Sequence, residues 1–395
     1  MLYKTLSLAL IVCGFMNANA QSDEDILQKT ISKLNSLETI EYTTTTYYFF
    51  EKMGYDKHDT VVCFFDFRSN DTLIGAKFQF EYNMAEAVFT GNSLFMLRLE
   101  QELITHGTNP SKRKVVSYLM HSIYTVRKLL PEIVKDTAIV INKEQDTLVN
   151  EIDSYNFKLT FKNGKNFGLD GELKSNSKHI KPLFYNLYIS KESYMPTQFT
   201  LSDPENNNKY EANFTDYNLA ATRDSSTWGY DRFDERYLRM SFKDYFMSFR
   251  AKANAQVGKL APDWTLPKVS GDSVSLSKLE NKLTLLEFWF PGCSPCIRAI
   301  PEINEIQKSY AEKGLEVYGI EFTKSADKLD VLQQYVEKHN VQIPTLFAGK
   351  EVAQQYGVNV APTFFLIDQK GTIKYSSLGY REGELKKAIE KELQE

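Results

Sequence analysis

The chain has 395 residues, which is enough for two or three domains with ordinary hydrophobic cores. Its formal net charge of -4 and pI near 5.9 show no basic footprint, so we expect no nucleic-acid partner. Aromatic residues make up 13% of the chain, and many of them lie between Tyr42 and Tyr245. This distribution indicates extensive apolar surfaces in the first part of the protein.

The first twenty residues have the pattern of a cleaved secretory signal peptide. Lys4 precedes an apolar stretch at 6–16, and Ala18-Asn19-Ala20 offers a small-x-small cleavage site. The apolar stretch is too short to span a bilayer, and no later run approaches that length. Cys13 follows Val12, where a bacterial lipoprotein needs a small residue. We therefore expect an exported product in the periplasm or cell envelope, without stable membrane insertion; the alternative is a buried N-terminal helix.

Three cysteines remain after the leader, namely Cys63, Cys293 and Cys296. An exported protein of this length with so few cysteines is not a scaffold held together by disulfides. Cys63 lies in the strand-like apolar run 61–65, which predicts a buried, inert thiol because free cysteine behaves as a small hydrophobe. A third redox cysteine is the alternative.

The part of the chain before residue 250 is dominated by strand patterns. Helical spacing predicts one helix from Asp23, capped at Ser22-Asp23, and a second between Val115 and Val134. This order predicts an α+β domain whose antiparallel sheet folds around an apolar interior. Runs rich in β-branched and aromatic residues predict strands at 40–50, 60–67, 76–82, 87–89, 94–99, 137–141, 154–162, 183–190, 194–201, 209–217 and 237–246.

One helix, a long antiparallel sheet and an inserted helix resemble, in layout alone, the periplasmic lipoprotein-carrier fold, a half-barrel closed by helices. The resemblance implies a cavity that holds an apolar ligand or a partner's peptide. The alternative is that these aromatic residues fill a core or support the second domain. No catalytic or metal-binding pattern occurs in this region, since His58, His106, His121 and His179 are scattered.

The polar, small-residue stretch from Ala251 to Val257 predicts a domain boundary near Gln256. Beyond it, a parallel βαβ pattern followed by a hairpin and a helix is the thioredoxin layout. We therefore expect an α+β domain at 21–250 and an α/β thioredoxin-like domain at 256–395. The predicted strands are 284–290, 315–322, 362–368 and 372–378, with a short segment at 345–348, and the predicted helices are 295–312, 326–340, 352–356 and 382–393.

The motif Cys293-Ser294-Pro295-Cys296 joins a buried strand to the start of a helix. Two cysteines at this spacing form a dithiol that can close into a small disulfide. At the helix start, unsatisfied N–H groups and the positive end of the helix dipole favour the thiolate of Cys293. Because the thiolate is the nucleophile in disulfide exchange, this motif predicts a thiol–disulfide oxidoreductase.

Residues from about 257 to the end resemble the exported TlpA/ResA-type thiol–disulfide oxidoreductases of the thioredoxin fold. The resemblance rests on the opening Val257–Trp264, the cysteine motif at 293–296, Pro301 and the segment Val360–Asp368, in that order. It implies exchange with cysteine-containing client proteins of the cell envelope, as in cytochrome c maturation, and a membrane electron donor. The absence of histidine between the cysteines favours the reducing direction.

The same resemblance implies roles for the two cysteines. Cys293 is the attacking thiolate and is expected to be partly exposed. Cys296, one helical turn further on and more buried, resolves the mixed disulfide and releases the reduced client. Pro295 fits the first helical turn because its missing N–H costs little there.

Pro362 is assigned to the catalytic site, and four further residues are assigned to client binding. Pro362 is expected to follow a cis peptide bond and to present the backbone of Ala361 for strand-like pairing; the alternative is an ordinary trans proline. Trp289, Pro291 and Gly292 complete the expected binding surface. Gly292 stands where the family commonly has tryptophan, so substrate recognition and redox potential are not carried over.

Glu287 lies six positions before Cys293 in an otherwise apolar strand, which matches the buried acid of thioredoxins. Burial raises the pKa of a carboxyl group. We expect Glu287 to accept the proton of Cys296 when that thiol attacks. The alternative is a glutamate paired with a lysine at the sheet edge.

Several rival functions are disfavoured, and no cofactor or metal is expected. A zinc site needs further Cys or His ligands, and Ile297 in place of histidine excludes a c-type haem attachment motif. The opening Val257–Trp264 also resembles peroxiredoxins, but their upstream Pro and Thr would fall at Leu286 and Phe290. From another class, the protein could be a periplasmic binding module for an apolar ligand or client protein, with an accessory dithiol.

Overall fold

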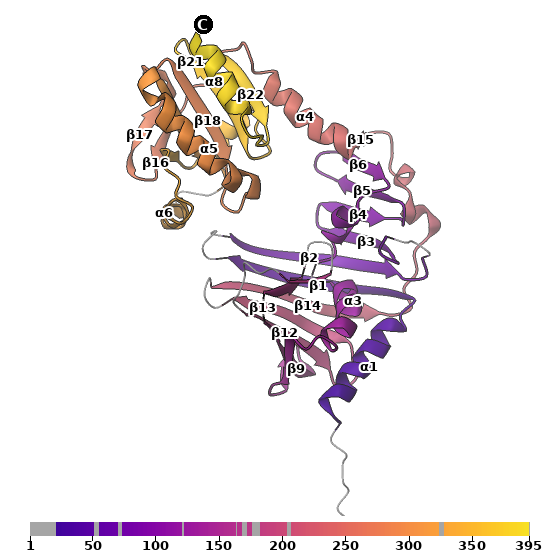
Figure 1. Ribbon diagram of the computed structural model, residues 1–395. Coiled ribbons are helices and arrows are strands. Elements are labelled where there is room, and N and C mark those ends of the chain that lie inside the picture. The colour runs from indigo at the N-terminus through magenta and orange to yellow at the C-terminus, as the bar shows by residue number, and fades with distance from the viewer. Residues whose placement is uncertain are drawn as a thin grey trace, which may run out of the picture.

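The computed structural model describes residues 21–50, 55–69, 73–120, 122–162, 164–167, 172–175, 182–203, 207–323 and 328–394. The expected signal peptide, His121 and His179 lie outside these residues. Across the described ranges, the chain forms one large sheet in its first part and a second sheet in its last third (Figure 1). No helix in these ranges is long and apolar enough to cross a membrane.

The first sheet contains thirteen of the described strands, in the order β15-β6-β5-β4-β3-β2-β1-β14-β13-β12-β9-β7, with β8 beside β9. The strands pair antiparallel, except that β15 runs parallel to β6. Their bounds are β1 (Thr39–Phe50), β2 (Tyr55–Asp66), β3 (Lys77–Tyr82), β4 (Ala85–Phe89), β5 (Ser93–Arg98), β6 (Leu103–Thr108), β7 (Ile139–Lys143), β8 (Thr147–Val149), β9 (Ile152–Phe161), β12 (Leu183–Ser190), β13 (Pro196–Asp203), β14 (Asn208–Asn218) and β15 (Leu238–Ser241). A separate small hairpin consists of β10 (Lys165–Phe167) and β11 (Leu173–Ser175).

Helices α1 (Asp23–Asn35) and α3 (Ile123–Ile133) cover one face of this sheet (Figure 1). Their apolar side chains join those of the strands in one large buried cluster, which explains the high aromatic content of this region. The predicted cap of α1 is confirmed, since Ser22 Oγ accepts a hydrogen bond from the Asp25 N–H at 3.1 Å.

The single helix expected between Val115 and Val134 is wrong. The segment contains two helices, α2 (Lys112–Val116) and α3, with a break between them. The backbone N–H of Ile123, at the start of α3, donates to the hydroxyl of Tyr42 on β1 at 3.2 Å. A contact with the sheet therefore sets where α3 begins. The spacing of apolar residues along the chain cannot predict such a long-range contact.

The strand expected at 237–246 is also only partly right. The strand β15 ends at Ser241, whose hydroxyl accepts from the Asp244 N–H and caps helix α4 (Phe242–Asn254). The first residues of the expected linker therefore belong to α4. Its last turn lies against the second sheet, where Ala253 is buried and the Ser376 hydroxyl donates to Asn254 at 3.1 Å.

The second sheet has the strand order β17-β16-β20-β19-β18-β21-β22 within the described residues. The central strand β18 runs parallel to β19 and antiparallel to β21. The expected thioredoxin-like layout is therefore present, with two additional strands, β16 and β17, that the sequence patterns did not indicate. The strands are β16 (Thr265–Lys268), β17 (Gly271–Ser275), β18 (Leu283–Trp289), β19 (Leu315–Glu321), β20 (Thr345–Leu346), β21 (Thr363–Asp368) and β22 (Ile373–Leu378).

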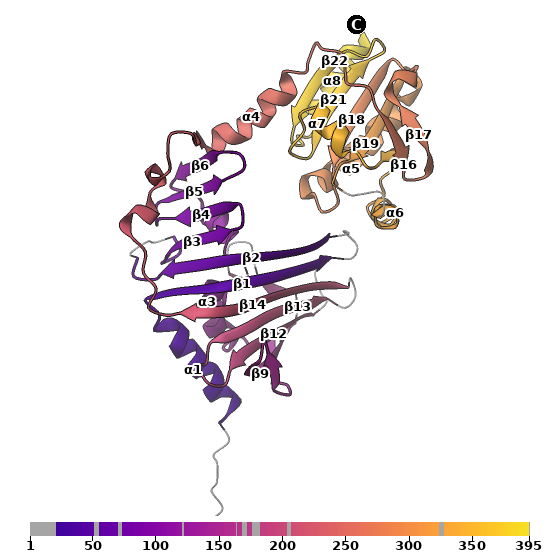
Figure 2. The ribbon, with the colours of Figure 1, turned by 180° about the vertical axis from the view of Figure 1, so that it is seen from behind.

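The helices of this part cover both faces of the sheet. Helices α5 (Ser294–Tyr310) and α8 (Glu384–Gln394) pack on one face. The short α7 (Lys350–Gln355) and the end of α4 pack on the other, and α6 (Leu329–Lys338) follows β19. Both views place α6 on the side facing the first sheet, while α4 connects the two sheets (Figures 1 and 2).

Candidate active site

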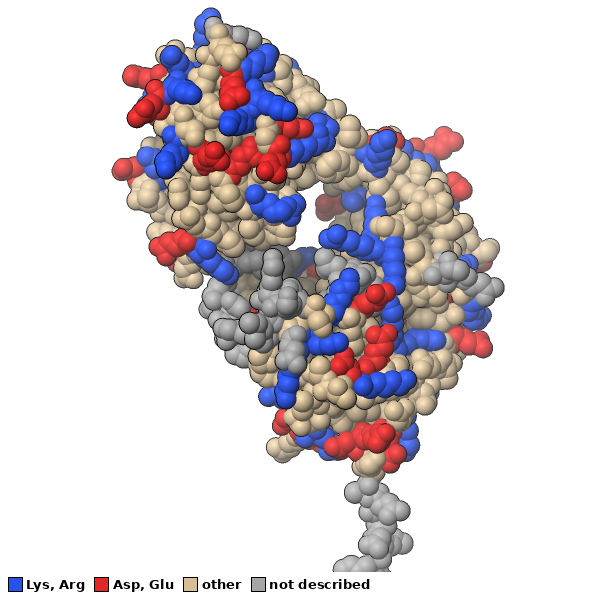
Figure 3. All heavy atoms as spheres, in the orientation of Figure 1, with Lys and Arg blue, Asp and Glu red and all other residues tan. Residues whose placement is uncertain are grey.

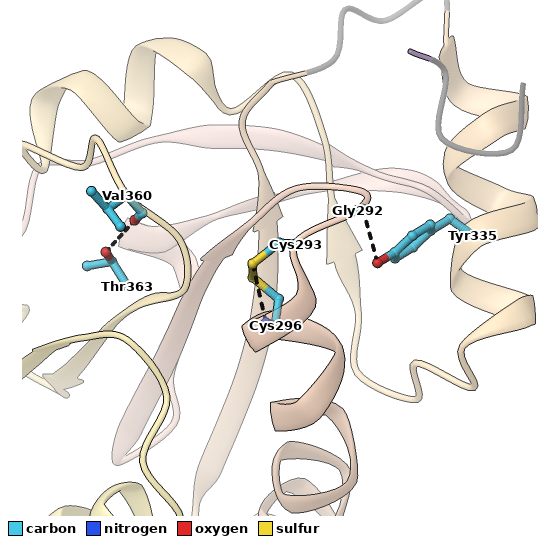
Figure 4. The surroundings of a disulfide bond; sticks show 6 residues. All are labelled: Gly292, Cys293, Cys296, Tyr335, Val360 and Thr363. Atoms are coloured by element: carbon cyan, nitrogen blue, oxygen red, sulfur yellow. Dashed lines mark hydrogen bonds between the residues drawn. A yellow bond between two sulfur atoms is a disulfide. The ribbon is translucent and has the colours of Figure 1, made fainter. Parts of the chain in front are cut away.

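The cysteine pair lies where β18 passes into α5. In the structure Cys293 and Cys296 form a disulfide, with their Cα atoms 5.2 Å apart (Figure 4). Cys293 occupies the N-cap position of α5, and its Sγ accepts a hydrogen bond from the Cys296 N–H at 3.3 Å. Pro295 falls in the first turn of the helix, where its missing N–H leaves no bond unmade. The sulfur that is expected to attack therefore already accepts a hydrogen bond from a backbone N–H group in the first turn of the helix.

The expectation that Cys293 is partly exposed is wrong for this oxidised state. Its side chain is 4% exposed, almost the same as the 3% of Cys296. Both cysteines belong to a small buried cluster with Trp289 and Tyr335. Tyr335 comes from α6, far along the chain, and its contribution to the burial of Cys293 cannot be predicted from the cysteine motif alone.

Tyr335 is a residue of the site that the sequence reasoning missed. Its hydroxyl accepts a hydrogen bond from the Gly292 N–H at 3.4 Å (Figure 4). Its ring stacks on that of Trp289, with the ring centroids 5.3 Å apart. The centroid of the His339 ring lies 4.3 Å from that of the Tyr335 ring. Tyr335 thus fixes the loop immediately before Cys293. The only sequence signal was its place on the buried side of a helix, which is shared by many core residues.

The peptide bond between Ala361 and Pro362 is cis, as predicted. Just beyond it, the Thr363 hydroxyl donates to the Val360 carbonyl at 2.7 Å. In the close-up view these two residues lie on one side of the disulfide and Tyr335 on the other (Figure 4). Two segments that are distant in sequence therefore flank the cysteine pair.

The residues assigned to client binding differ in exposure. Trp289 and Pro291 are buried, Ala361 is half-buried and Gly292 is exposed. Gly292 has a φ of 87°, in the left-handed region that favours glycine. Gly292, which stands where the family commonly has tryptophan, is thus the exposed residue of this group. Its backbone conformation is also one that favours glycine.

Glu287 lies in the middle of the sheet, paired with Gly319 on β19 and Phe364 on β21. The alternative of a lysine-paired residue at the sheet edge is therefore excluded. Its side chain is 4% exposed, and its Oε1 has no hydrogen-bond partner among the described residues. Burial raises the pKa of this carboxyl to about 8. Side chains alternate along a strand, so Glu287 shares the face of Leu285, on which α5 packs.

A second buried carboxylate, Glu321, was not predicted. It ends β19 directly beside Trp289 on β18. Its Oε1 accepts hydrogen bonds from the backbone N–H and the hydroxyl of Thr323, at 2.7 and 2.6 Å. This carboxylate therefore fixes the turn after β19, whereas Glu287 is left with an unpaired oxygen.

Substituting Gly319 by alanine is expected to disturb the tryptophan beside the dithiol. An added Cβ would come within 2.9 Å of Trp289 Nε1 and 3.3 Å of Ile343. We expect the overpacking to lower the free energy of unfolding by about 1–3 kcal/mol. Urea denaturation measures this loss. In the double variant Gly319→Ala/Trp289→Phe, the smaller ring should recover part of it, whereas strictly additive losses would contradict the contact.

Comparison with known proteins is consistent with this geometry. The AhpC/TSA family model matches residues 257–376. The thiol-disulfide oxidoreductase ResA of Bacillus thuringiensis is 32% identical over 155 residues, which are 38% of this chain and 87% of that relative. The thioredoxin-like protein YneN of Bacillus subtilis is 31% identical over 130 residues, 33% of this chain and 76% of that relative.

The chain belongs to the ResA family of thiol-disulfide oxidoreductases. Family members are enzymes, and the stretch 257–376 that the AhpC/TSA model matches contains both cysteines and the strands from β16 to β21. Of the solved structures, a DsbE thiol:disulfide interchange protein from Chlorobium tepidum is 30% identical and covers 35% of this chain and 97% of its own, with a TM-score of 0.31. The thioredoxin domain of an oxidoreductase from Bacteroides vulgatus is 27% identical and covers 34% and 96%, also with a TM-score of 0.31.

Proposed function

We propose that this oxidoreductase is an exported reductase of protein disulfides, acting on cysteine-containing clients in the periplasm or cell envelope. The observation that carries the proposal is the position of Cys293 Sγ at the N-terminus of α5, within hydrogen-bond reach of the Cys296 N–H. A negative charge on that sulfur is stabilised by the N–H group and by the helix dipole. The Cys293 thiolate is therefore available to attack a client disulfide, and the absence of histidine between the cysteines favours the reducing direction.

In the first step the Cys293 thiolate attacks one sulfur of the client disulfide. A new S–S bond forms between Cys293 and the client, the client's own S–S bond breaks, and its second sulfur leaves as a thiolate. The product is a mixed disulfide. We assign Trp289, Pro291, Gly292 and the backbone of Ala361 to holding the client, with Pro362 fixing that segment.

In the second step Cys296 resolves the mixed disulfide. Its thiol loses a proton, for which we propose the ionised form of Glu287 as the acceptor, because this buried carboxyl group lies on the face under α5 and has an unpaired oxygen. Since its pKa is about 8, the share of the ionised form grows as the pH rises towards that value. The resulting thiolate attacks Cys293 Sγ, the bond between Cys293 and the first client sulfur breaks, and that first sulfur leaves as a thiolate. Two electrons have passed to the client, and the oxidoreductase is left as the Cys293–Cys296 disulfide described above.

Each turnover needs two electrons and two protons to restore the dithiol. We propose a membrane-bound dithiol donor for these electrons, since an exported protein is separated from cytoplasmic reductants. Cytochrome c maturation is one process that such a reductase would serve. The proposal assumes that residues 1–20 are a cleaved leader.

We also propose that the protein is built from two domains, at 21–250 and 256–395, and that the first is a half-barrel. Its large sheet with α1 and α3 on one face supports this view (Figure 1). Figure 3 shows an opening between the first part of the chain and the thioredoxin-like part, beside α4. The dithiol lies at the end of β18, and β19 leads at the same end into α6, which faces the first sheet. A client would thus approach the dithiol from the side on which the first domain lies.

The test is a single-turnover reaction between the fully reduced, leaderless protein and a purified protein disulfide such as insulin. We expect two client thiols to appear for each Cys293–Cys296 disulfide formed, as counted by mass spectrometry after alkylation. If the protein instead transfers its disulfide to reduced clients and does not reduce oxidised ones, the assigned direction is wrong.

A further inference from the structure

A cavity of about 330 Å³ lies on the helix-covered face of the first sheet, remote in sequence from the dithiol. Its walls come from β1, β2 and β3 and from the segment that joins α2 to α3. Small-molecule sites commonly have volumes of about 300–1,000 Å³. The cavity is therefore large enough for a small ligand.

The described lining of the cavity is aromatic and hydroxyl-rich, and none of it is lysine or arginine. Phe80, Tyr82 and Tyr118 supply ring surfaces. The one carboxylate in this lining, Asp59, is partly exposed, and Lys57 holds it in an ion pair at 2.5 Å. The lining thus offers nothing to neutralise a buried anion, which is costly to desolvate without a partner.

The Cys63 thiol and the Tyr82 hydroxyl in the wall stay neutral at physiological pH. Burial raises the pKa of the Cys63 thiol, and it also raises the pKa of the Tyr82 hydroxyl. Cys63 is therefore an inert part of the wall and not a third redox thiol, in line with the prediction of a buried thiol.

One polar group in the wall has no hydrogen bond. Thr44 is 7% exposed, and its Oγ1 has no partner among the described residues. A buried hydroxyl without a partner is uncommon, because the lost bonds to water are not replaced. Rotation about the Cα–Cβ bond moves Oγ1 to another staggered position, so this hydroxyl can turn to meet a ligand in the cavity.

We propose that this cavity binds a small uncharged molecule with a flat apolar body and one hydrogen-bonding group. The body packs against the aromatic walls, and the hydrogen-bonding group meets Thr44. The site is separate from the dithiol and does not depend on the proposed reductase function. It makes the first part of the chain a ligand-binding unit attached to an oxidoreductase.

The test compares two fluorescent probes with the same ring system, using the full leaderless chain. N-phenyl-1-naphthylamine is uncharged, and 8-anilino-1-naphthalenesulfonate adds only a sulfonate. We expect saturable binding of the neutral probe at one site per chain and at least about tenfold weaker binding of the sulfonate. Equal affinities for the two probes, or no saturable binding of the neutral one, would overturn the proposal.

Two variants locate the binding. Thr44→Val keeps the shape of the side chain and removes the hydroxyl, so affinity for the neutral probe should fall about five- to tenfold. Thr46→Trp places a large ring in the cavity and should abolish binding. Circular dichroism and an unchanged rate of insulin reduction show that each variant is folded. A double serine variant of Cys293 and Cys296 should bind the probe like the wild type; unchanged binding in both cavity variants, or lost binding in the serine variant, would refute the site.

Discussion

Replacing Cys293 by serine is expected to abolish disulfide reduction, with the rate falling on the order of a thousandfold or more, because the remaining Cys296 thiol does not lie at the N-cap position that favours the attacking thiolate. Cys296→Ser is expected to behave differently. It retains the attacking thiolate and still forms the mixed disulfide, but it stops there. The rate of insulin reduction under multiple turnover, together with the amount of covalent complex, separates these two outcomes.

The matched control is Cys63→Ser, which removes a thiol that is 2% exposed and lies in the first part of the chain. Its reduction rate should equal that of the wild type. Equal losses in the Cys293 and Cys296 variants, with no covalent complex in either, would contradict the assignment of separate attacking and resolving roles.

Replacing Glu287 by glutamine is expected to remove a pH-dependent destabilisation. In the folded protein the pKa of this carboxyl is about 8, against an ordinary value of 4.5. Between these values the folded state holds a proton that the unfolded state has released, so the free energy of unfolding falls as pH rises. The loss reaches about 3 kcal/mol by pH 7. Urea denaturation of the oxidised protein at pH 5 and pH 8 measures this fall in the free energy of unfolding. The contribution of residue 287 to the fall should be absent from Glu287→Gln.

The same variant tests the proton transfer. Without the carboxylate, resolution of the mixed disulfide by Cys296 should slow by about a hundredfold and lose its dependence on an ionisation near pH 8. Glu312→Gln, at an exposed position just beyond α5, is the matched control and should change neither the stability profile nor the rate. A pH profile of resolution that is unchanged in Glu287→Gln would refute the role of this residue.

The cysteine site was predictable wherever the chemistry is local. A buried strand followed by Cys293-Ser294-Pro295-Cys296 contains both the helix start and the dithiol. Nearby motifs also predicted the burial of Glu287 and the cis peptide bond before Pro362. Tyr335 could not be found in this way, because it contacts Gly292 through the tertiary fold, from 43 residues further along the chain. The burial of Cys293 was missed because motif reading does not include packing partners that lie far along the chain.

In the fold, too, features set by the local sequence were predictable and features set by contacts elsewhere in the chain were not. Long strands such as β1 and β18 were evident from their residue types, since β-branched, aromatic and apolar runs fit a buried pleated surface. The break before α3 and the change from strand to helix at Ser241 depend on a tyrosine of the sheet and on a serine cap. Short strands such as β16 and β17 carry little pattern of their own and are defined by pairing with their neighbours.

The most direct test of disulfide reduction through Cys293 is to trap the intermediate. Full-length Cys296→Ala is expressed in a bacterial cell envelope, free thiols are blocked by alkylation, and covalent complexes are isolated under non-reducing conditions. We expect client proteins joined to the chain through Cys293, as mapped by mass spectrometry, and none with the Cys293→Ser/Cys296→Ala double variant. If no client is joined to Cys293, or if the double variant traps the same proteins, the account is contradicted.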